Sequence, residues 1–255
     1  MICFLFVQAI LRNEALRGEI MKRRPQLPIL FIAVTIAFQL FSTPAIASEL
    51  PGDKDLRHAF PEPVILIDVG HGGIDGGTSY GNILEKDINL DIGRRLYLIL
   101  RSHGYRAILN RTDDYALSDD NRWLKSRSRH IRDLAQRKEL SEHIPASIVV
   151  SLHVNWGRNK SKRGALVLHQ NEGRSALLAH SLQNALERLY DNYILKFPEL
   201  GKPFYLLNHI DSPAVIVEAG FLSNPEDRAM LTNHRGQQKI AEAIYLGILE
   251  YFTVS

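Results

Sequence analysis

The stretch Ala214–Pro225, AVIVEAGFLSNP, decides the fold. Its apolar run predicts a buried strand that ends at the carboxylate of Glu218, with a glycine two residues later. Proteins of the α/β class place their chemistry at such carboxyl ends of buried strands. Two earlier stretches have the same form: IDVGHGG, which leads to His71, and SLHVN, which contains His153. We therefore expect three strand ends to meet at one edge of a sheet.

The first 47 residues differ in character from the rest of the chain. A basic cluster at Met21–Arg24, a mostly apolar run at Leu27–Phe41 and the A-x-A site Ala45–Ala47 are the three parts of a secretory signal peptide. The apolar run is shorter than the roughly 20 residues that a membrane-spanning helix needs. We expect cleavage after the A-x-A site, with residues 1–47 as the signal peptide. We also expect translation to start at Met21, so that residues 1–20 are an over-extended start.

Cleavage removes the positive charge and the only cysteine. The whole chain carries a formal net charge of +3, but residues 48–255 keep 26 Lys and Arg and 26 Asp and Glu. A neutral mature chain gives no argument for nucleic-acid binding. Because Cys3 is lost with the leader, the exported domain has neither disulfides nor thiolate ligands. Any metal must be held by His, Asp or Glu.

Strand and helix patterns alternate without internal repeats, which predicts one α/β domain over residues 62–255 after a linker at 48–61. We expect three layers, with a mostly parallel or mixed central sheet of about six strands flanked by helices on both faces. Residues 123–142 predict a helix rich in Lys and Arg, with Ile131, Leu134 and Leu140 facing inward. Its Lys and Arg should be solvated or, alternatively, in contact with an anionic glycan or peptide. The patterns place strands at 64–69, 105–110, 147–152, 164–169, 204–207 and 214–217, helices at 85–102, 123–142, 175–190, 225–231 and 237–251, and a loop at 191–200.

A glycine-rich loop follows the first strand. Residues 70–82, GHGGIDGGTSYGN, contain six glycines, which permit positive φ angles and close approach of the backbone to a ligand. A strand, a glycine loop and a helix also describe a dinucleotide site. The G-x-G-x-x-G fingerprint fails here, however, because Asp75 stands where a glycine is required. An exported protein also has little access to NAD.

The polar residues around this loop indicate a metal site. His71 lies between glycines, Glu85 opens the helix after the loop, and His153 belongs to another buried strand. Two imidazoles and one carboxylate with an open fourth position are the His₂Glu arrangement of catalytic zinc. Glu218 would be a second carboxylate nearby, able to act as general base. The chain has no HExxH motif and no HxxE at His71, so the proposed ligands are dispersed along the sequence.

Four stretches, IDVGHGGIDGG, LEKDINL, VSLHVN and VEAGFLSNP, resemble the signature stretches of the zinc-dependent N-acetylmuramoyl-L-alanine amidases that cleave bacterial peptidoglycan. They occur in the family's order across nearly the whole mature chain. The resemblance implies one zinc ion per chain, held by His71, Glu85 and His153, with Glu218 as the catalytic glutamate. It further implies a structural role for Arg137. The family usually has proline at Val69, a departure that should loosen the start of the loop without touching a ligand.

Within that family the chain most resembles the sporulation and germination type. The grounds are a long basic stretch before SLHVN, the compact passage YLLNHIDSPAVIVEAGFLSNP, and no binding-repeat domain in the sequence. The resemblance implies hydrolysis of the amide between N-acetylmuramic acid and the L-alanine of the stem peptide, a step toward muramic-δ-lactam in the spore cortex. Asn155 is expected to position substrate.

The expected partner is peptidoglycan, reached by export to the cell wall or the forespore intermembrane space, or to a periplasm where an outer membrane exists. An accessory lipoprotein or a homodimer is compatible with the sequence, which does not decide between them. Two other functions stay open at this point. The chain could be a zinc peptidase that cuts within the stem peptide, or a peptidoglycan-binding module without catalytic activity.

Overall fold

The computed structural model describes residues 63–190 and 196–255. The predicted signal peptide, the start at Met21 and the linker at 48–61 lie outside these residues. No helix in the described ranges is both long and apolar enough to cross a membrane.

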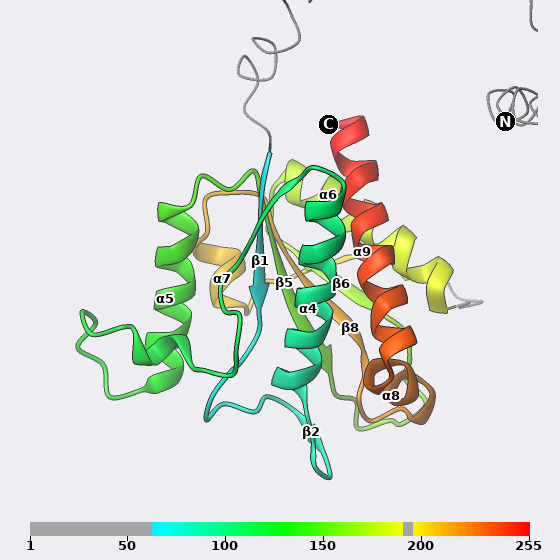
Figure 1. Cartoon of the computed structure of the whole chain (residues 1–255), viewed down its shortest axis with the longest axis horizontal. Coiled ribbons are helices and arrows are strands. Elements are labelled where there is room, and N and C mark those ends of the chain that lie inside the picture. Colours follow the sequence, from blue (N-terminus) through cyan, green and yellow to red (C-terminus); the bar gives the residue numbers. More distant parts are fainter. Residues whose placement is uncertain (1–62, 191–195) are drawn as a thin grey trace, which may run out of the picture. The chain divides into compact units, whose positions relative to one another are not determined.

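A six-stranded sheet forms the middle layer of the domain, with the strand order β4-β1-β5-β8-β6-β7 (Figure 1). Strands β4, β1, β5 and β8 run parallel, β6 is antiparallel to β8, and β7 is parallel to β6. The prediction of a mixed, mostly parallel sheet is confirmed. The strands are β1 (Val64–Val69), β4 (Arg106–Leu109), β5 (Ile148–Asn155), β6 (Leu166–His169), β7 (Glu199–Leu200) and β8 (Ala214–Phe221).

The register of the parallel strands brings the predicted strand ends together. Val69 on β1 lies beside Leu152 on β5, and His153 lies directly beside Glu218 on β8. Both β5 and β8 continue beyond these two residues, and the register shifts between His153 and Asn155. The side chains of His153 and Glu218 therefore lie near the ends of β5 and β8 but not at their last residues.

Helices cover both faces of the sheet (Figure 1). On one face, α4 (Glu85–Ser102), α6 (Gly173–Tyr190) and α9 (His234–Val254) share a core with Ile65 and Ile67 of β1. On the other face, α5 (Arg129–His143) and α7 (Tyr205–His209) pack against a smaller core that includes Leu66. All six residues of β1 are buried, as expected for a strand covered on both sides. Helix α8 (Pro225–Thr232) contacts α9.

Two of the predicted helices and strands differ from the structure. The predicted strand at 204–207 belongs largely to α7, because an apolar run of four residues cannot distinguish a short strand from a helical turn. Helix α5 begins at Arg129 rather than at 123. Ser128 caps this end, because its side chain accepts a hydrogen bond from the amide of Ile131. Ile131 is 51% exposed, and the buried side of α5 consists of Ala135, Arg137 and Ser141.

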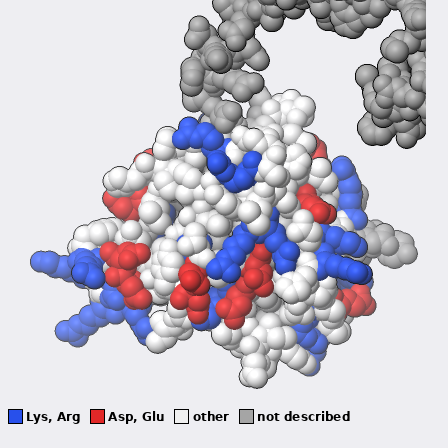
Figure 2. Space-filling view, viewed as in Figure 1, with Lys and Arg blue, Asp and Glu red and all other residues white. Residues whose placement is uncertain are grey.

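Smaller elements occupy the long connections. A hairpin of β2 (Ser79–Tyr80) and β3 (Ile83–Leu84) extends the glycine loop, and a 3₁₀ turn, η1 (Leu117–Asp119), precedes α5. β7 lies inside the segment predicted as a loop at 191–200. Basic and acidic side chains are interspersed on the face seen in Figure 2, and basic side chains project at the left, where the connection into α5 lies in Figure 1. Arg122, Lys125 and Arg127 of that connection and Arg129 at the start of α5 are exposed, which fits both a solvated face and contact with an anionic glycan or peptide.

A buried ion pair links β1 to α5. Asp68 is only 3% exposed, and its Oδ1 accepts a hydrogen bond from Arg137 at 2.7 Å while its Oδ2 accepts one from the Ser151 hydroxyl at 2.5 Å. Asp133 contacts Arg137 from the other side, at 2.6 Å. Burial alone would raise the pKa of Asp68, but Arg137 and Ser151 outweigh it and hold the pKa below its ordinary value of 3.8.

We expect Asp68→Asn to lower the free energy of unfolding at pH 7 by about 3 kcal/mol, because it leaves a buried guanidinium short of its counter-charge. Since the folded-state pKa of Asp68 lies below 3.8, its stabilisation is complete above that pH and is lost as the pH falls through the folded-state pKa. The difference between wild type and variant should therefore shrink in acid. Urea unfolding at pH 7 and pH 3 checks this, with the exposed Asp120→Asn as control. Equal stabilities at pH 7 would contradict it.

Candidate metal centre

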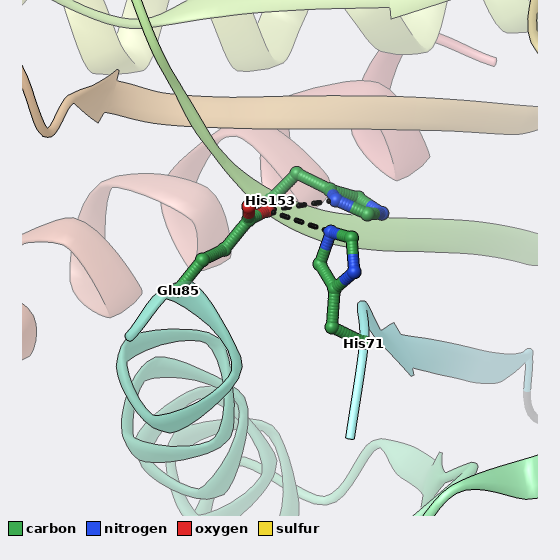
Figure 3. Close-up of side chains that lie close together, drawn as sticks. All are labelled: His71, Glu85 and His153. Atoms are coloured by element: carbon green, nitrogen blue, oxygen red, sulfur yellow. Dashed lines mark hydrogen bonds and ion pairs between the residues drawn. The ribbon is translucent and has the colours of Figure 1, made fainter. Parts of the chain in front are cut away.

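Three side chains from separate elements converge at the carboxyl edge of the sheet (Figure 3). His71 follows β1, Glu85 begins α4 and His153 lies on β5. One potential ligand atom from each lies within 4.8 Å of the others. His71 Nε2 and His153 Nδ1 both face Glu85 Oε1, at 3.2 and 3.0 Å. The two imidazole rings are nearly perpendicular, at 82°, with centroids 5.0 Å apart. The structure thus brings together the three predicted ligands.

His71 is held in an unusual backbone conformation. Its φ of 61° is the only positive value of a non-glycine residue among those the structure describes, and this region costs such a residue about 1–2 kcal/mol. Its Nδ1 contacts Asp75 Oδ2 at 2.8 Å, while Asp75 Oδ1 accepts a hydrogen bond from the Gly77 amide at 3.1 Å. Asp75 therefore directs the opposite ring nitrogen, Nε2, toward Glu85. Carboxylates commonly orient metal-binding histidines in this way.

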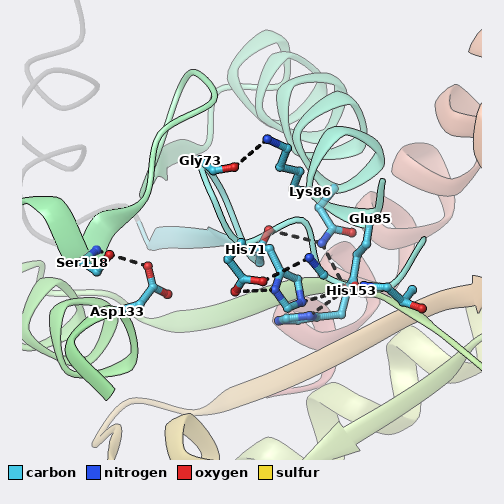
Figure 4. Close-up of polar contacts among 12 residues, drawn as sticks. His71, Gly73, Glu85, Lys86, Ser118, Asp133 and His153 are labelled. Atoms are coloured by element: carbon cyan, nitrogen blue, oxygen red, sulfur yellow. Dashed lines mark hydrogen bonds and ion pairs between the residues drawn. The ribbon is translucent and has the colours of Figure 1, made fainter. Parts of the chain in front are cut away.

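Glu85 is almost fully buried, at 3% exposure, and is fixed by backbone donors. The amide of Val154 donates to Oε1 at 3.0 Å, and the amide of Thr78 donates to Oε2 at 2.8 Å. Figure 4 shows Glu85 beside His71 and His153. Burial alone would raise the pKa of Glu85, but the contacts with His153 and His71 outweigh it and hold the pKa well below its ordinary range. Glu85 is therefore ionised in the folded protein.

Two glycines of the loop make this close packing possible. A Cβ at Gly70 would lie 2.4 Å from Cε1 of His153, and one at Gly77 would lie 2.5 Å from Oε2 of Glu85. Both distances are too short for real atoms, so any larger residue would displace a potential ligand. Gly77 also has a φ of 67°, which glycine adopts readily. The glycine density noted in the sequence therefore serves the arrangement of the site.

The electrostatics of the site favour a bound cation. Burial alone would lower the pKa of His71, but its contacts with Asp75 and Glu85 outweigh it and raise the pKa to about 9. The contact with His71 in turn lowers the pKa of Asp75 to about 2. Without metal, a proton on His71 supplies positive charge between two carboxylates, and a metal ion can replace that proton. The two imidazoles and one carboxylate suit zinc, so these donors fit a single ion.

Glu218 has a different environment from Glu85. It lies beside His153 on the neighbouring strand, and its Oε2 is buried without a hydrogen-bond partner among the residues the structure describes. Burial raises the pKa of Glu218, and the nearby carboxylate of Glu85 adds to this effect, although His153 opposes it. A carboxyl group with a raised pKa is suited to accept and return a proton near neutral pH. Glu218 is not one of the three grouped ligands.

The structure also shows polar residues that the sequence predictions missed. In the sequence Asp75 breaks the dinucleotide pattern, and its place four residues after a loop histidine is the signal that could indicate a partner for His71. Arg111 is 1% exposed and follows a strand, so its burial was not evident from the sequence. Burial lowers the pKa of Arg111 to about 10, with the nearby charge of Arg137 adding to this.

Two further predictions have different outcomes. The Val69 amide donates to Asn110 Oδ1 at 2.8 Å, a bond that a proline could not make, so the start of the loop is tethered rather than loosened. The side chain of Asn155 accepts a hydrogen bond from the amide of Trp156 at 2.7 Å and is not among the grouped ligands. Its role toward substrate stays a prediction.

Comparison with known proteins identifies the relatives of this chain. Residues 65–250 match the family described as N-acetylmuramoyl-L-alanine amidase. The germination-specific N-acetylmuramoyl-L-alanine amidase of Bacillus subtilis is 34% identical over 191 residues, covering 74% of this chain and 80% of that protein.

Solved structures agree with this result. The CwlD amidase from Clostridioides difficile, in complex with the GerS lipoprotein, has a TM-score of 0.71 and 34% identity and covers 76% of this chain and 100% of its own. The amidase AmiC2 of Nostoc punctiforme has a TM-score of 0.61 and 31% identity, covering 75% of this chain and 97% of its own.

We expect Asp75→Asn to weaken metal binding by about 10- to 100-fold, because the neutral amide no longer fixes the orientation of the His71 ring as firmly. Competition with a chromogenic chelator measures the affinity. Asp113→Asn is a matched control, because it makes the same chemical change at a side chain that is 84% exposed and does not contact His71. Equal affinities of wild type and Asp75→Asn would show that Asp75 does not support the metal site.

Proposed function

Because the chain belongs to the family of N-acetylmuramoyl-L-alanine amidases, which act on peptidoglycan, we propose that it hydrolyses the amide between N-acetylmuramic acid and L-alanine as a zinc enzyme. One observation carries the proposal. The grouped His71, Glu85 and His153 offer ligands for one metal ion, and Glu218 lies in register beside His153 without belonging to that group. A ligand set and a separate proton acceptor are the two parts that metal-assisted amide hydrolysis requires.

In this proposal His71, Glu85 and His153 hold the zinc ion. When bound, zinc would act as a Lewis acid and lower the pKa of water, so that water can react near neutral pH. The ionised state of Glu85 suits it to a metal ligand, and the Val154 and Thr78 amides limit its movement. Asp75 keeps His71 Nε2 facing the ion.

Glu218 moves the proton. Its free Oε2 accepts the proton of the attacking water, and the same carboxyl group then donates that proton to the departing amine of L-alanine. The raised pKa of Glu218 supports both steps, because the group must gain and release a proton within one turnover. Glu85, whose pKa is held low, cannot take this role.

We further propose that the enzyme acts outside the cytoplasm, in maturation of the spore cortex. The 34% identity to the germination-specific amidase of Bacillus subtilis supports this role, as does the predicted signal peptide. An accessory lipoprotein is a reasonable partner, since the similar CwlD amidase was solved in complex with the GerS lipoprotein.

The two glutamates should respond differently to substitution. Glu218→Gln should keep zinc and lose turnover by at least about 100-fold, because the amide cannot accept a proton. His153→Ala should lose both zinc and turnover. Zinc content of the purified protein and the rate of peptidoglycan hydrolysis separate the two outcomes. Near-normal turnover by Glu218→Gln would end the assignment of the base.

Mass spectrometry of muropeptides tests the bond that is cut. The purified enzyme should free intact stem peptides from the glycan, whereas a stem peptidase would release fragments and a binding module would release nothing. In spores of a strain that lacks the protein, muramic-δ-lactam should be missing, because its formation begins with loss of the stem peptide. Spores with normal lactam would overturn the cortex role while leaving the amidase reaction in place.

A further inference from the structure

Two buried arginines contact the backbone on both sides of His71. Arg111 and Arg137 are 1% and 5% exposed, and both reach the segment at which β1 enters the glycine loop. The Nη2 group of Arg111 donates to the carbonyl oxygen of Gly70 at 3.1 Å. The Nη2 group of Arg137 donates to the carbonyl oxygen of His71 at 3.0 Å. Both arginines also donate to the carbonyl oxygen of Val69, at 3.3 and 2.8 Å.

The positions of these contacts matter for the conformation of His71. The Gly70 carbonyl belongs to the peptide group before the Cα of His71, and the His71 carbonyl belongs to the peptide group after it. The φ and ψ angles of a residue are set by the orientations of these two peptide planes. Arg111 fixes the first plane and Arg137 fixes the second. Together they hold the left-handed backbone that places the imidazole over Glu85.

The hydrogen-bond partners of Arg111 are all main-chain groups. Its guanidinium forms no ion pair within the described residues and donates only to main-chain carbonyls, those of Val69, Gly70, Lys86 and Asp113. The Lys86 carbonyl, at 2.8 Å, belongs to the residue after Glu85. One side chain therefore ties the His71 segment to the start of α4. Burying a guanidinium is costly, and here the cost is offset by hydrogen bonds to main-chain carbonyls of the His71 segment and of the start of α4.

We propose that Arg111 and Arg137 are positioning residues that hold His71 and the start of α4 in the geometry needed to bind the metal. The inference rests on the proposed zinc function and assigns to these arginines a role beyond stabilising the fold. A planar guanidinium can donate to two carbonyls at once, whereas the compact ammonium of lysine cannot span the same pair. Substitution by lysine therefore keeps the charge and removes the fixed geometry.

Zinc affinity of Arg111→Lys and Arg137→Lys tests the proposal. Each should bind zinc about tenfold or more weakly than wild type in chelator competition. The visible absorption of the cobalt-loaded protein should also change, because that absorption reports ligand geometry. Unfolding of the metal-free proteins is measured alongside, so that affinities refer to folded protein. Arg95→Lys is the matched control: Arg95 is half-buried and contacts His234 and Gln238 of α9, away from the loop.

A double-mutant cycle with His71→Ala distinguishes positioning of His71 from a general structural effect. Because both arginines contact the backbone of the His71 segment, the lysine substitutions should weaken the residual zinc binding of His71→Ala less than they weaken that of wild type. Only the part of the Arg111 effect that reaches Glu85 through the Lys86 carbonyl should remain. Equal losses in both backgrounds, or unchanged zinc affinity in the wild-type background, would overturn the proposal.

A second variant covers the case in which Arg137→Lys does not fold. Asp133→Asn keeps both guanidiniums and removes the carboxylate that contacts Arg137 Nε, so it should weaken zinc binding in the same direction. Unchanged affinity in this variant would count against the role of Arg137. A wild-type protein that takes up no zinc would overturn the proposed function together with this inference, whereas zinc binding that the arginine variants leave intact would overturn this inference alone.

Discussion

The parallel register of β5 against β8 is the constraint on which the rest of the site depends. It places His153 beside Glu218 and leaves β1 on the other side of β5, so that His71 and its loop reach the same edge. A shift of either strand by one residue would turn one of the two side chains to the opposite face. Apolar residues on both faces of the two strands oppose such a shift. Val150, Leu152, Val215 and Val217 belong to the larger core, and Val149, Ala214 and Ile216 belong to the smaller one. The register that packs the core is therefore also the register that places His153 beside Glu218.

The carboxylates at this edge differ because their surroundings differ. Asp75 and Glu85 both contact imidazole groups, and their pKa values are lowered. Glu218 has no hydrogen-bond donor for its buried oxygen among the described residues, and its pKa is raised. Identical chemical groups thus divide into those that stay charged and one that can exchange a proton. The division follows from burial, neighbouring donors and nearby charges, which is why we propose different roles for the two glutamates.

Much of this arrangement could be predicted from the sequence. The β-branched runs and the polar residues at their ends indicated the strands that bring His71, His153 and Glu218 together. The failures have local causes: the four-residue run at 204–207 fits a strand or a helical turn equally, and the start of α5 depends on the Ser128 cap. Arg111 bonds to Gly70, 41 residues away in the chain, and Asp68 bonds to Arg137, 69 residues away, so no local pattern identifies them. Prediction succeeded where periodicity carries the signal and failed where the folded path of a loop decides the contacts.

The position of β8 in the chain decides when the site can be completed. β8 comes last in the chain among the strands of the sheet, yet it lies between β5 and β6. A chain that ends before Ala214 holds all three grouped residues but lacks both the proposed base, Glu218, and the strand that joins the two parts of the sheet. The complete site can therefore form only after β8 has inserted between β5 and β6. The strand that completes the sheet is thus also the strand that completes the site.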